Sequence, residues 1–213
     1  LSLMLLVSAG LLIRSFGDLM TVDRGFETKD RLIVAVDMPQ SYETERREEV
    51  RDRFLERIGK IPTVHSVSAV STRPLDTGST GMGIVAAGQS GDPRADVPWA
   101  SWRIVTGDYF QTLGTPLLRG RTFDDDDRIG EPWRVIISER LAELLWPGED
   151  PIGRTAILWK GQVDDKAEIV GVVGPMRGRG LEVDPTLAVY LPFQGAGWSS
   201  VQFVLHAAGD PVA

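Results

Sequence analysis

Four consecutive aspartates, Asp124 to Asp127, form the densest group of potential metal ligands in the sequence. A calcium-binding loop alternates its acidic positions and then has a glycine, whereas Arg128 and Ile129 follow this run. Four adjacent carboxylates also diverge unless the backbone turns sharply. We therefore expect a solvated acidic turn, with a weak cation site as the alternative. Replacing the four charges together should then change stability little, because surface substitutions usually cost less than about 0.5 kcal/mol each.

Other motifs that could support catalysis are incomplete. His65 and His206 each lie in a strand-like segment without the neighbouring ligands of a zinc site or a general base. Gly81, Gly83 and Ala86 match a dinucleotide-binding pattern, but turn-rich sequence surrounds them where a strand and a helix are required. The sequence contains no Walker phosphate loop and no nucleophile elbow. We expect no catalytic, cofactor-binding or metal-binding residue, no cofactor and no enzyme activity.

Six tryptophans and one small basic segment are the remaining distinctive features. Trp99 and Trp102 lie three residues apart in a predicted strand, so they should face opposite sides of the sheet. Packing is the ordinary role for all six, and contact with a partner is the alternative. The basic segment MRGRG, residues 176–180, is expected to be a solvated turn rather than an anion site. The other four tryptophans are Trp133, Trp146, Trp159 and Trp198.

Composition limits the classes of partner and chemistry. The chain has 213 residues, of which 42% are hydrophobic and 25% charged, as in globular domains. Its net charge of −7 argues against a nucleic-acid partner, since phosphate binding requires basic patches. The absence of cysteine excludes disulfides, thiol catalysis and thiolate metal sites.

The first 13 residues, Leu1 to Ile13, carry no charge, and Arg14 ends this apolar run. Because the run would be apolar around the whole circumference of a helix, it should be buried deeply or lie in lipid. We interpret it as the C-terminal end of a transmembrane helix that continues upstream to about 20 apolar residues. It should project away from the domain. A signal-peptide remnant and a core helix are the alternatives.

A βαβ unit should follow a short linker. Residues 31–37 are expected to form a strand buried on both faces, and residues 64–70 a second strand. Residues 42–58 between them should form a helix capped by Ser41. Its apolar stripe should pack on the sheet that contains both strands. The stripe consists of Val50, Phe54, Leu55 and Ile58.

The rest of the chain is predicted to be mostly β. Turn-rich sequence brackets a short apolar piece before a series of strands and two short helices. The helices are expected over 106–114 and 139–147, the second capped by Ser138. The last strand, 201–208, should place Val201, Phe203 and Leu205 on one face and share the sheet of the βαβ unit. The other expected strands cover 99–105, 133–138, 155–160, 167–174 and 187–192.

Four segments in this order resemble the MacB-like periplasmic core domain of ABC transporter permeases, including the duplicated orphan permeases of soil bacteria. They are TPLLRGRTFDDDD, VIISERLAELLWPGEDPIGRT, EIVGVVGPMRG and AVYLPF, within residues 115–193. The most specific pieces are Gly120 to Phe123 and Trp146 to Gly153, although the family usually has phenylalanine at the position of Trp146. The opening LLVSAGLLIRSF is similar to the end of the transmembrane helix that precedes this domain.

The resemblance implies an α+β fold in which a mostly β insertion with two short helices interrupts a βαβ half similar to the porter subdomains of efflux pumps. Asp210 and Pro211 form a helix-start signature, so that half should be truncated at its second helix and leave apolar sheet surface uncovered. The expected divisions are 1–16, the end of a membrane helix; 17–30, a linker; 31–75, the first part of the porter-like half; 76–192, the insertion; and 193–213, the return strand.

The resemblance also implies a function and its partners. The domain would face the periplasm or cell exterior in the cytoplasmic membrane and couple the movement of an ATP-binding partner subunit to export or extraction of a substrate. A homodimeric permease is implied, and a periplasmic adaptor or a lipoprotein is a possible further partner. A membrane-tethered or secreted ligand-binding domain without a transport role is the alternative function.

Overall fold

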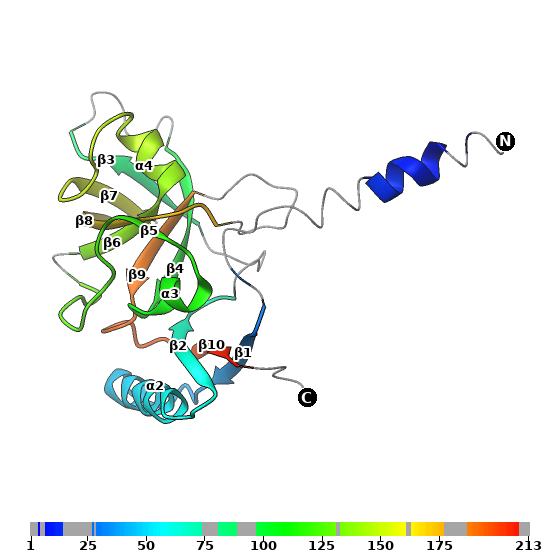
Figure 1. Cartoon of the computed structure of the whole chain (residues 1–213). Coiled ribbons are helices and arrows are strands. Elements are labelled where there is room, and N and C mark those ends of the chain that lie inside the picture. Colours follow the sequence, from blue (N-terminus) through cyan, green and yellow to red (C-terminus); the bar gives the residue numbers. More distant parts are fainter. Residues whose placement is uncertain are drawn as a thin grey trace.

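A computed structural model describes residues 4, 7–14, 27, 29–73, 81–88, 97–130, 133–160, 163–176 and 187–208, with the backbone alone at 160, 163 and 164. Figure 1 shows the elements. The helices are α2 (Thr44–Gly59), α3 (Tyr109–Leu113) and α4 (Glu139–Leu145). The strands are β1 (Arg31–Asp37), β2 (Val64–Val70), β3 (Gly81–Ala86), β4 (Trp99–Val105), β5 (Leu117–Gly120), β6 (Trp133–Ser138), β7 (Thr155–Lys160), β8 (Val163–Val173), β9 (Ala188–Pro192) and β10 (Ser200–Ala207).

The two ends of the described chain meet in one three-stranded part. Strand β10 lies between β1 and β2 and pairs antiparallel with both. The strands β1 and β2 therefore run parallel, and α2 connects them. This confirms the expectation that the last strand joins the sheet of the βαβ unit.

Helix α2 packs on this sheet through the expected stripe. Val50, Phe54, Leu55 and Ile58 are half-buried against the main core. The ring of Phe54 stacks on that of Phe203 in β10, with 4.0 Å between the ring centroids. The predicted cap is wrong: the Tyr42 N–H donates to the Pro39 carbonyl in a turn, and the helix starts later, at Thr44. Glu43 occupies the N-cap position, and no side chain caps the helix.

Six further strands pair in a closed cycle, and we call these six strands the ring. Each strand in the order β4, β3, β7, β8, β6, β9 pairs with the next, and β9 returns to β4. Apolar side chains from all six strands fill the interior as part of the main core, among them Ile84, Ile137, Ala156 and Val189. The ring closes the insertion on itself, so these strands have no free edge along the paired stretches.

A second apolar cluster lies outside the ring, under α3. It includes Tyr109, Phe110 and Leu113 of α3, which pack with Val70 of β2 and Val204 of β10. Because Val204 belongs to this cluster while Phe203 belongs to the main core, β10 is buried on both faces. The predicted common face of Val201, Phe203 and Leu205 is confirmed, as all three contribute to the main core.

Two expectations about individual strands are wrong. The first strand is not buried on both faces, because β1 is an edge strand and Ile33 and Ala35 are exposed. The stretch containing Gly81 and Gly83 is a strand, β3, not part of a turn-rich segment. A Cβ at Gly81 would lie 1.6 Å from the indole nitrogen of the exposed Trp99, so any other residue there would displace that side chain. The short, exposed strand β5 was not predicted either.

The apolar N-terminal segment stands apart from the rest. Residues 7–14 are helical, and Leu11, Leu12 and Ile13 are between 63% and 74% exposed. Figure 1 shows this helix away from the sheet, as predicted. Within the described residues, no helix reaches the length and apolarity needed to cross a membrane. A role as the end of a transmembrane helix stays a prediction.

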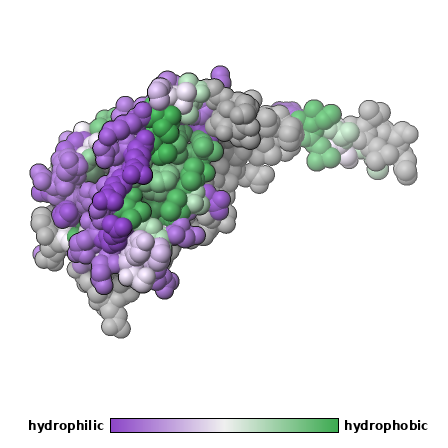
Figure 2. All heavy atoms as spheres, turned by 90° about the horizontal axis from the view of Figure 1, so that it is seen from below, coloured by the Kyte–Doolittle hydropathy of each residue, from purple (hydrophilic) through white to green (hydrophobic). Residues whose placement is uncertain are grey.

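Apolar surface also remains beside α2. Leu32, Val34 and Val36 of β1 point to the same face of the sheet as Phe203 but are only half-buried. Figure 2 shows hydrophobic atoms beside a hydrophilic stripe on the face that is seen from below. Since these side chains of β1 also pack partly against the main core, the expected uncovered apolar sheet surface stays a prediction. The proposed helix start at Asp210 and the residues 177–180 of MRGRG lie outside the described residues, whereas Met176 is buried.

Candidate functional site

The loop 193–199 is the only described connection from the ring back to the three-stranded part, since it joins β9 to β10. Gly197 in this loop has a left-handed φ of 58°. A Cβ at Gly197 would lie 2.6 Å from the Thr44 hydroxyl at the start of α2. Glycine thus allows the loop to approach the helix closely. We call loop 193–199 the joint.

Three polar residues of α2 hold the joint. Arg51, only 2% exposed, donates to the Phe193 carbonyl at 3.1 Å and to Gln194 Oε1 at 2.8 Å, and its guanidinium lies 5.0 Å from the centre of the Phe193 ring. Arg47 donates to the Gly197 carbonyl at 2.5 Å. The Gly195 N–H donates to Glu48 Oε1.

Strand β4 of the ring and the segment that precedes β6 hold the joint from the other side. The Ile129 N–H donates to the Gln194 carbonyl at 2.8 Å, and Arg128 forms a β-bridge with Gln194. The Phe193 N–H donates to the Val105 carbonyl of β4 at 3.1 Å. The joint is therefore bound to α2 and to the ring at once, and relative movement of the two parts must break or rearrange these bonds.

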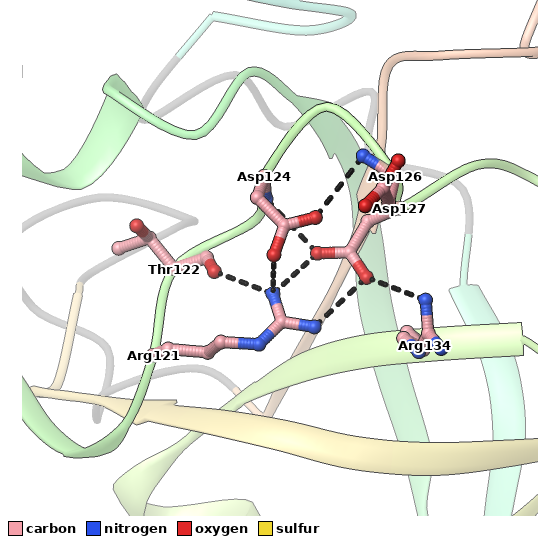
Figure 3. Close-up of polar contacts among 6 residues, drawn as sticks. All are labelled: Arg121, Thr122, Asp124, Asp126, Asp127 and Arg134. Atoms are coloured by element: carbon pink, nitrogen blue, oxygen red, sulfur yellow. Dashed lines mark hydrogen bonds and ion pairs between the residues drawn. The ribbon is translucent and has the colours of Figure 1, made fainter.

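The acidic run precedes Arg128 directly and is not the solvated turn that was predicted. The side chain of Asp127 is fully buried. It accepts from Arg121 at 2.5 and 3.0 Å, from Arg134 of β6 at 3.2 Å and from the Asp124 N–H at 2.9 Å (Figure 3). Burial acts to raise the pKa of Asp127, but these hydrogen bonds outweigh it and hold the pKa below the usual aspartate value.

The other three aspartates fit the prediction better. Asp124, Asp125 and Asp126 are exposed, although Asp124 forms an ion pair with Arg121 and accepts from the Asp126 N–H (Figure 3). Within the described part of the chain, no group of three or more acidic or histidine side chains is placed to hold a metal ion. A cleft of about 260 Å³ separates this turn from α2, with Arg51 and Asp108 on its walls.

The segment from Gly120 to Phe123 positions this network. Gly120 has a left-handed φ of 71°, and a Cβ there would lie 2.2 Å from the Val170 carbonyl of β8. Arg121 then binds Asp127, and Phe123 is buried in the second cluster. Three of the four positions, Gly120, Arg121 and Phe123, thus have distinct structural roles.

The structure brings the two histidines together. The rings of His65 and His206 lie edge to face, 4.9 Å apart. Burial and the positive charge of Arg31 nearby, together with His65, lower the pKa of His206. Described carboxylates do not complete a metal site around them.

The tryptophans divide as predicted for a sheet. Trp99 is 65% exposed and Trp102 only 7%, which confirms that they face opposite sides. Trp102 and Trp146 are buried in the main core, with Trp133 and Trp198 packed against it. Packing is therefore the main role, and Trp99 is the most exposed of the six.

The residues that hold the joint were not predicted from the sequence. Arg47 and Arg51 precede Leu55 at spacings of eight and four residues, so they continue the apolar stripe of α2 toward its N-terminus. A charged residue on the buried face of a helix needs a partner there. The two arginines on the apolar face of this helix were the signal in the sequence from which a buried polar contact could have been predicted.

Two of the known structures that match this chain share its fold. The periplasmic region of MacB from Actinobacillus actinomycetemcomitans matches with a TM-score of 0.53 and 17% identity, over 91% of this chain and 81% of that one. A domain of a permease protein from Porphyromonas gingivalis, described as putative, matches with a TM-score of 0.50 and 12% identity, over 87% and 79%. The extracellular domain of the transporter YknZ from Gram-positive bacteria matches with a TM-score of 0.49 and 17% identity, over 84% of each chain.

The curated protein sequences contain no match to this chain. The family model described as MacB-like periplasmic core domain matches residues 1–212, which is nearly the whole sequence. The chain belongs to the family of MacB-like periplasmic core domains of ABC transporter permeases.

Proposed function

We propose that this domain is the extracytoplasmic part of a permease subunit in the cytoplasmic membrane, and that it transmits the movement of an ATP-binding partner subunit to a substrate on the outer side. The family match over residues 1–212 carries this proposal. The domain itself performs no catalysis, and ATP hydrolysis belongs to the partner. The intact permease is a homodimer, and an adaptor protein or a lipoprotein contacts this domain.

The bonds around the joint support a mechanical role. A displacement of α2 acts directly on the backbone of Phe193 and Gly197, because Arg51 and Arg47 bind their carbonyl groups. The N–H of Ile129, in the segment that precedes β6 of the ring, donates to the Gln194 carbonyl of the same loop. A contiguous network of this kind couples two parts of a molecule when it has two arrangements that an external input can bias.

Distance measurements in the complete permease test the proposal. Since this chain contains no cysteine, a single Glu45→Cys substitution on the exposed face of α2 gives one spin label per copy of the domain. We expect the distance between the two labels to shift by several ångströms between the nucleotide-free and ATP-bound complex (a change on the scale of known allosteric shifts).

A partner subunit that binds but does not hydrolyse ATP is the control, and it should hold the complex in the ATP-bound distance. An unchanged distance in every nucleotide state, in a complex with normal ATP hydrolysis, would contradict the proposal and favour a tethered binding domain.

A further inference from the structure

The closed ring has a cavity of about 180 Å³ at one end. Its rim and walls come from the whole ring, and the joint contributes Ala196 and Trp198. The mouths of β-barrels are common places for small-molecule sites. Each strand supplies a side chain to the cavity: Met82 of β3, Trp102 of β4, Trp133 of β6, Leu158 of β7, Asp165 of β8 and Leu191 of β9.

Three indole rings line this cavity. The rings of Trp102 and Trp198 are nearly perpendicular, at 84°, with 5.8 Å between their centroids, and Trp133 lies on another part of the wall. Indole rings attract cations over their faces more strongly than other aromatic side chains do. Several aromatic walls at steep angles are the arrangement that surrounds an alkylated ammonium group from more than one side.

One carboxylate shares the cavity with the indoles. Asp165 pairs with Leu158 across the β7–β8 ladder, so both side chains lie on the inner face of the ring. Asp165 is half-buried among these apolar and aromatic side chains. A carboxylate among apolar and aromatic side chains is costly without a compensating positive charge.

We propose that the cavity at the mouth of the ring binds a compact organic cation that carries a quaternary or alkylated ammonium group. The ligand is a small molecule that is free in solution and not a lipid headgroup. The size fits, because a dry cavity of about 150 Å³ holds a benzene molecule. A hydrated metal ion is disfavoured, since it requires several oxygen ligands and the cavity supplies one carboxylate. The apolar walls take the alkyl groups, while Asp165 and the indole faces balance the charge.

This inference goes beyond the proposed function and does not depend on it, because binding can be measured without transport. A bound cation would contact Trp198 and Ala196, which belong to the joint that α2 holds. Occupancy would therefore stabilise the joint in the arrangement described here.

Titration of the intact chain with choline, in an uncharged detergent, tests the proposal. Tryptophan fluorescence and calorimetry measure the binding. We expect saturable binding of choline and at least about tenfold weaker binding of 3,3-dimethylbutan-1-ol, its uncharged isostere. Asp165→Asn and Trp198→Leu should each weaken choline binding about tenfold. Trp99→Leu, which removes an exposed indole outside the cavity, is the matched control and should leave the affinity unchanged.

Three results would overturn the assignment. The first is equal affinity for choline and the neutral isostere, and the second is equal losses in Trp99→Leu and Trp198→Leu. The third is tighter binding of phosphocholine than of choline, which would identify a lipid headgroup as the ligand. A melting temperature for Asp165→Asn that equals that of the unmodified chain shows that its weaker binding does not result from unfolding.

Discussion

Asp125 and Asp127 lie two residues apart in the same acidic run, yet only Asp127 is buried. The difference comes from the surrounding backbone and strands. Arg121 follows the left-handed Gly120, and Arg134 lies on β6, so both guanidinium groups reach the same carboxylate. Asp127 thus links the acidic turn to β6 of the ring through Arg134. The next two residues in the sequence, Arg128 and Ile129, bind the joint.

Asp127→Asn should lower the free energy of unfolding by about 1.5–3 kcal/mol, the usual range for hydrogen bonds to charged groups. The amide keeps the shape but loses the charge that two arginines bind. Urea unfolding measures the difference. Asp125→Asn is the control within the same turn and should change stability by less than about 0.5 kcal/mol. Equal effects of the two substitutions would contradict the role given to Asp127.

The same carboxylate should make stability depend on pH in a defined direction. Because its pKa is lower in the folded state, Asp127 stabilises the fold above the unfolded-state pKa of about 3.9 and loses this effect as pH falls through the folded-state value. The difference in unfolding free energy between the unmodified chain and Asp127→Asn should therefore be largest near pH 7 and shrink below about pH 4. A difference that grows in acid would refute this assignment.

Helix α2 performs two tasks with one face. Its C-terminal half packs Phe54 and Ile58 on the sheet, and its N-terminal half binds the joint through Arg47, Glu48 and Arg51. Both tasks follow from the helical spacing of three and four residues. A change in the position of α2 therefore affects the sheet and the joint together.

Arg51→Ala should weaken the joint more than the fold of the ring. The substitution removes the hydrogen bonds to the Phe193 carbonyl and the Gln194 side chain, and should cost about 2–4 kcal/mol because a buried carbonyl loses its charged donor. Hydrogen exchange should become faster at amides of the joint while those of β6 and β8 stay protected. Arg53→Ala, an exposed position on the same helix, is the control. Uniformly faster exchange would instead indicate a general loss of stability.

Phe54→Ala should cost about 2–3 kcal/mol, at or below the lower end of the range for a fully buried phenylalanine, because Phe54 is half-buried. The loss comes mainly from its stacking on Phe203. Thermal or urea unfolding measures it, with Arg57→Ala on the exposed face as control. A cost below about 0.5 kcal/mol would show that α2 does not depend on this contact.

The described strands, apart from β5, form a closed ring and an open three-stranded part. The ring protects its strands by closure, whereas β1 is an edge strand with apolar side chains still half-exposed beside α2 (Figures 1 and 2). The exposed apolar helix over 7–14 adds further apolar surface. Contacts with a membrane or with other parts of a permease are therefore expected at the open part and the N-terminal helix, not along the ladders of the ring.

The N-terminal helix should control association with lipid. The intact chain is expected to float with phosphatidylcholine liposomes in a density gradient, because Leu11, Leu12 and Ile13 are exposed and apolar. Replacing Leu11 and Leu12 with lysine should reduce the bound fraction at least about tenfold, since charged side chains are excluded from the hydrocarbon layer. Leu118→Lys, an exposed leucine of β5, is the control. Unchanged flotation of the double variant would show that another surface binds lipid.

Local sequence patterns determined most of the elements. The apolar stripe of α2, the alternation in β10 and the runs that form β4, β6, β7 and β9 all depend on residues close in the chain, whose spacing fixes which side chains share a face. Gly114 likewise ends α3 in a left-handed conformation, at the predicted position. The four segments near residues 115–193 were sufficient to identify the family.

Tertiary structure decided what local patterns do not contain. Whether β1 is an edge strand and whether six strands close into a ring depend on contacts between residues far apart in the sequence. Arg121 and Arg134 lie only six and seven residues from Asp127, but the left-handed Gly120 and strand β6 decide that both reach its carboxylate. Arginine side chains are usually exposed, but that of Arg51 is buried because Phe193 and Gln194 supply its hydrogen-bond acceptors. These two residues lie more than a hundred positions later in the sequence. Burial of a charged group is determined by the partners that the fold brings to it, and for this reason the joint and the cavity at the mouth of the ring could be located only in three dimensions.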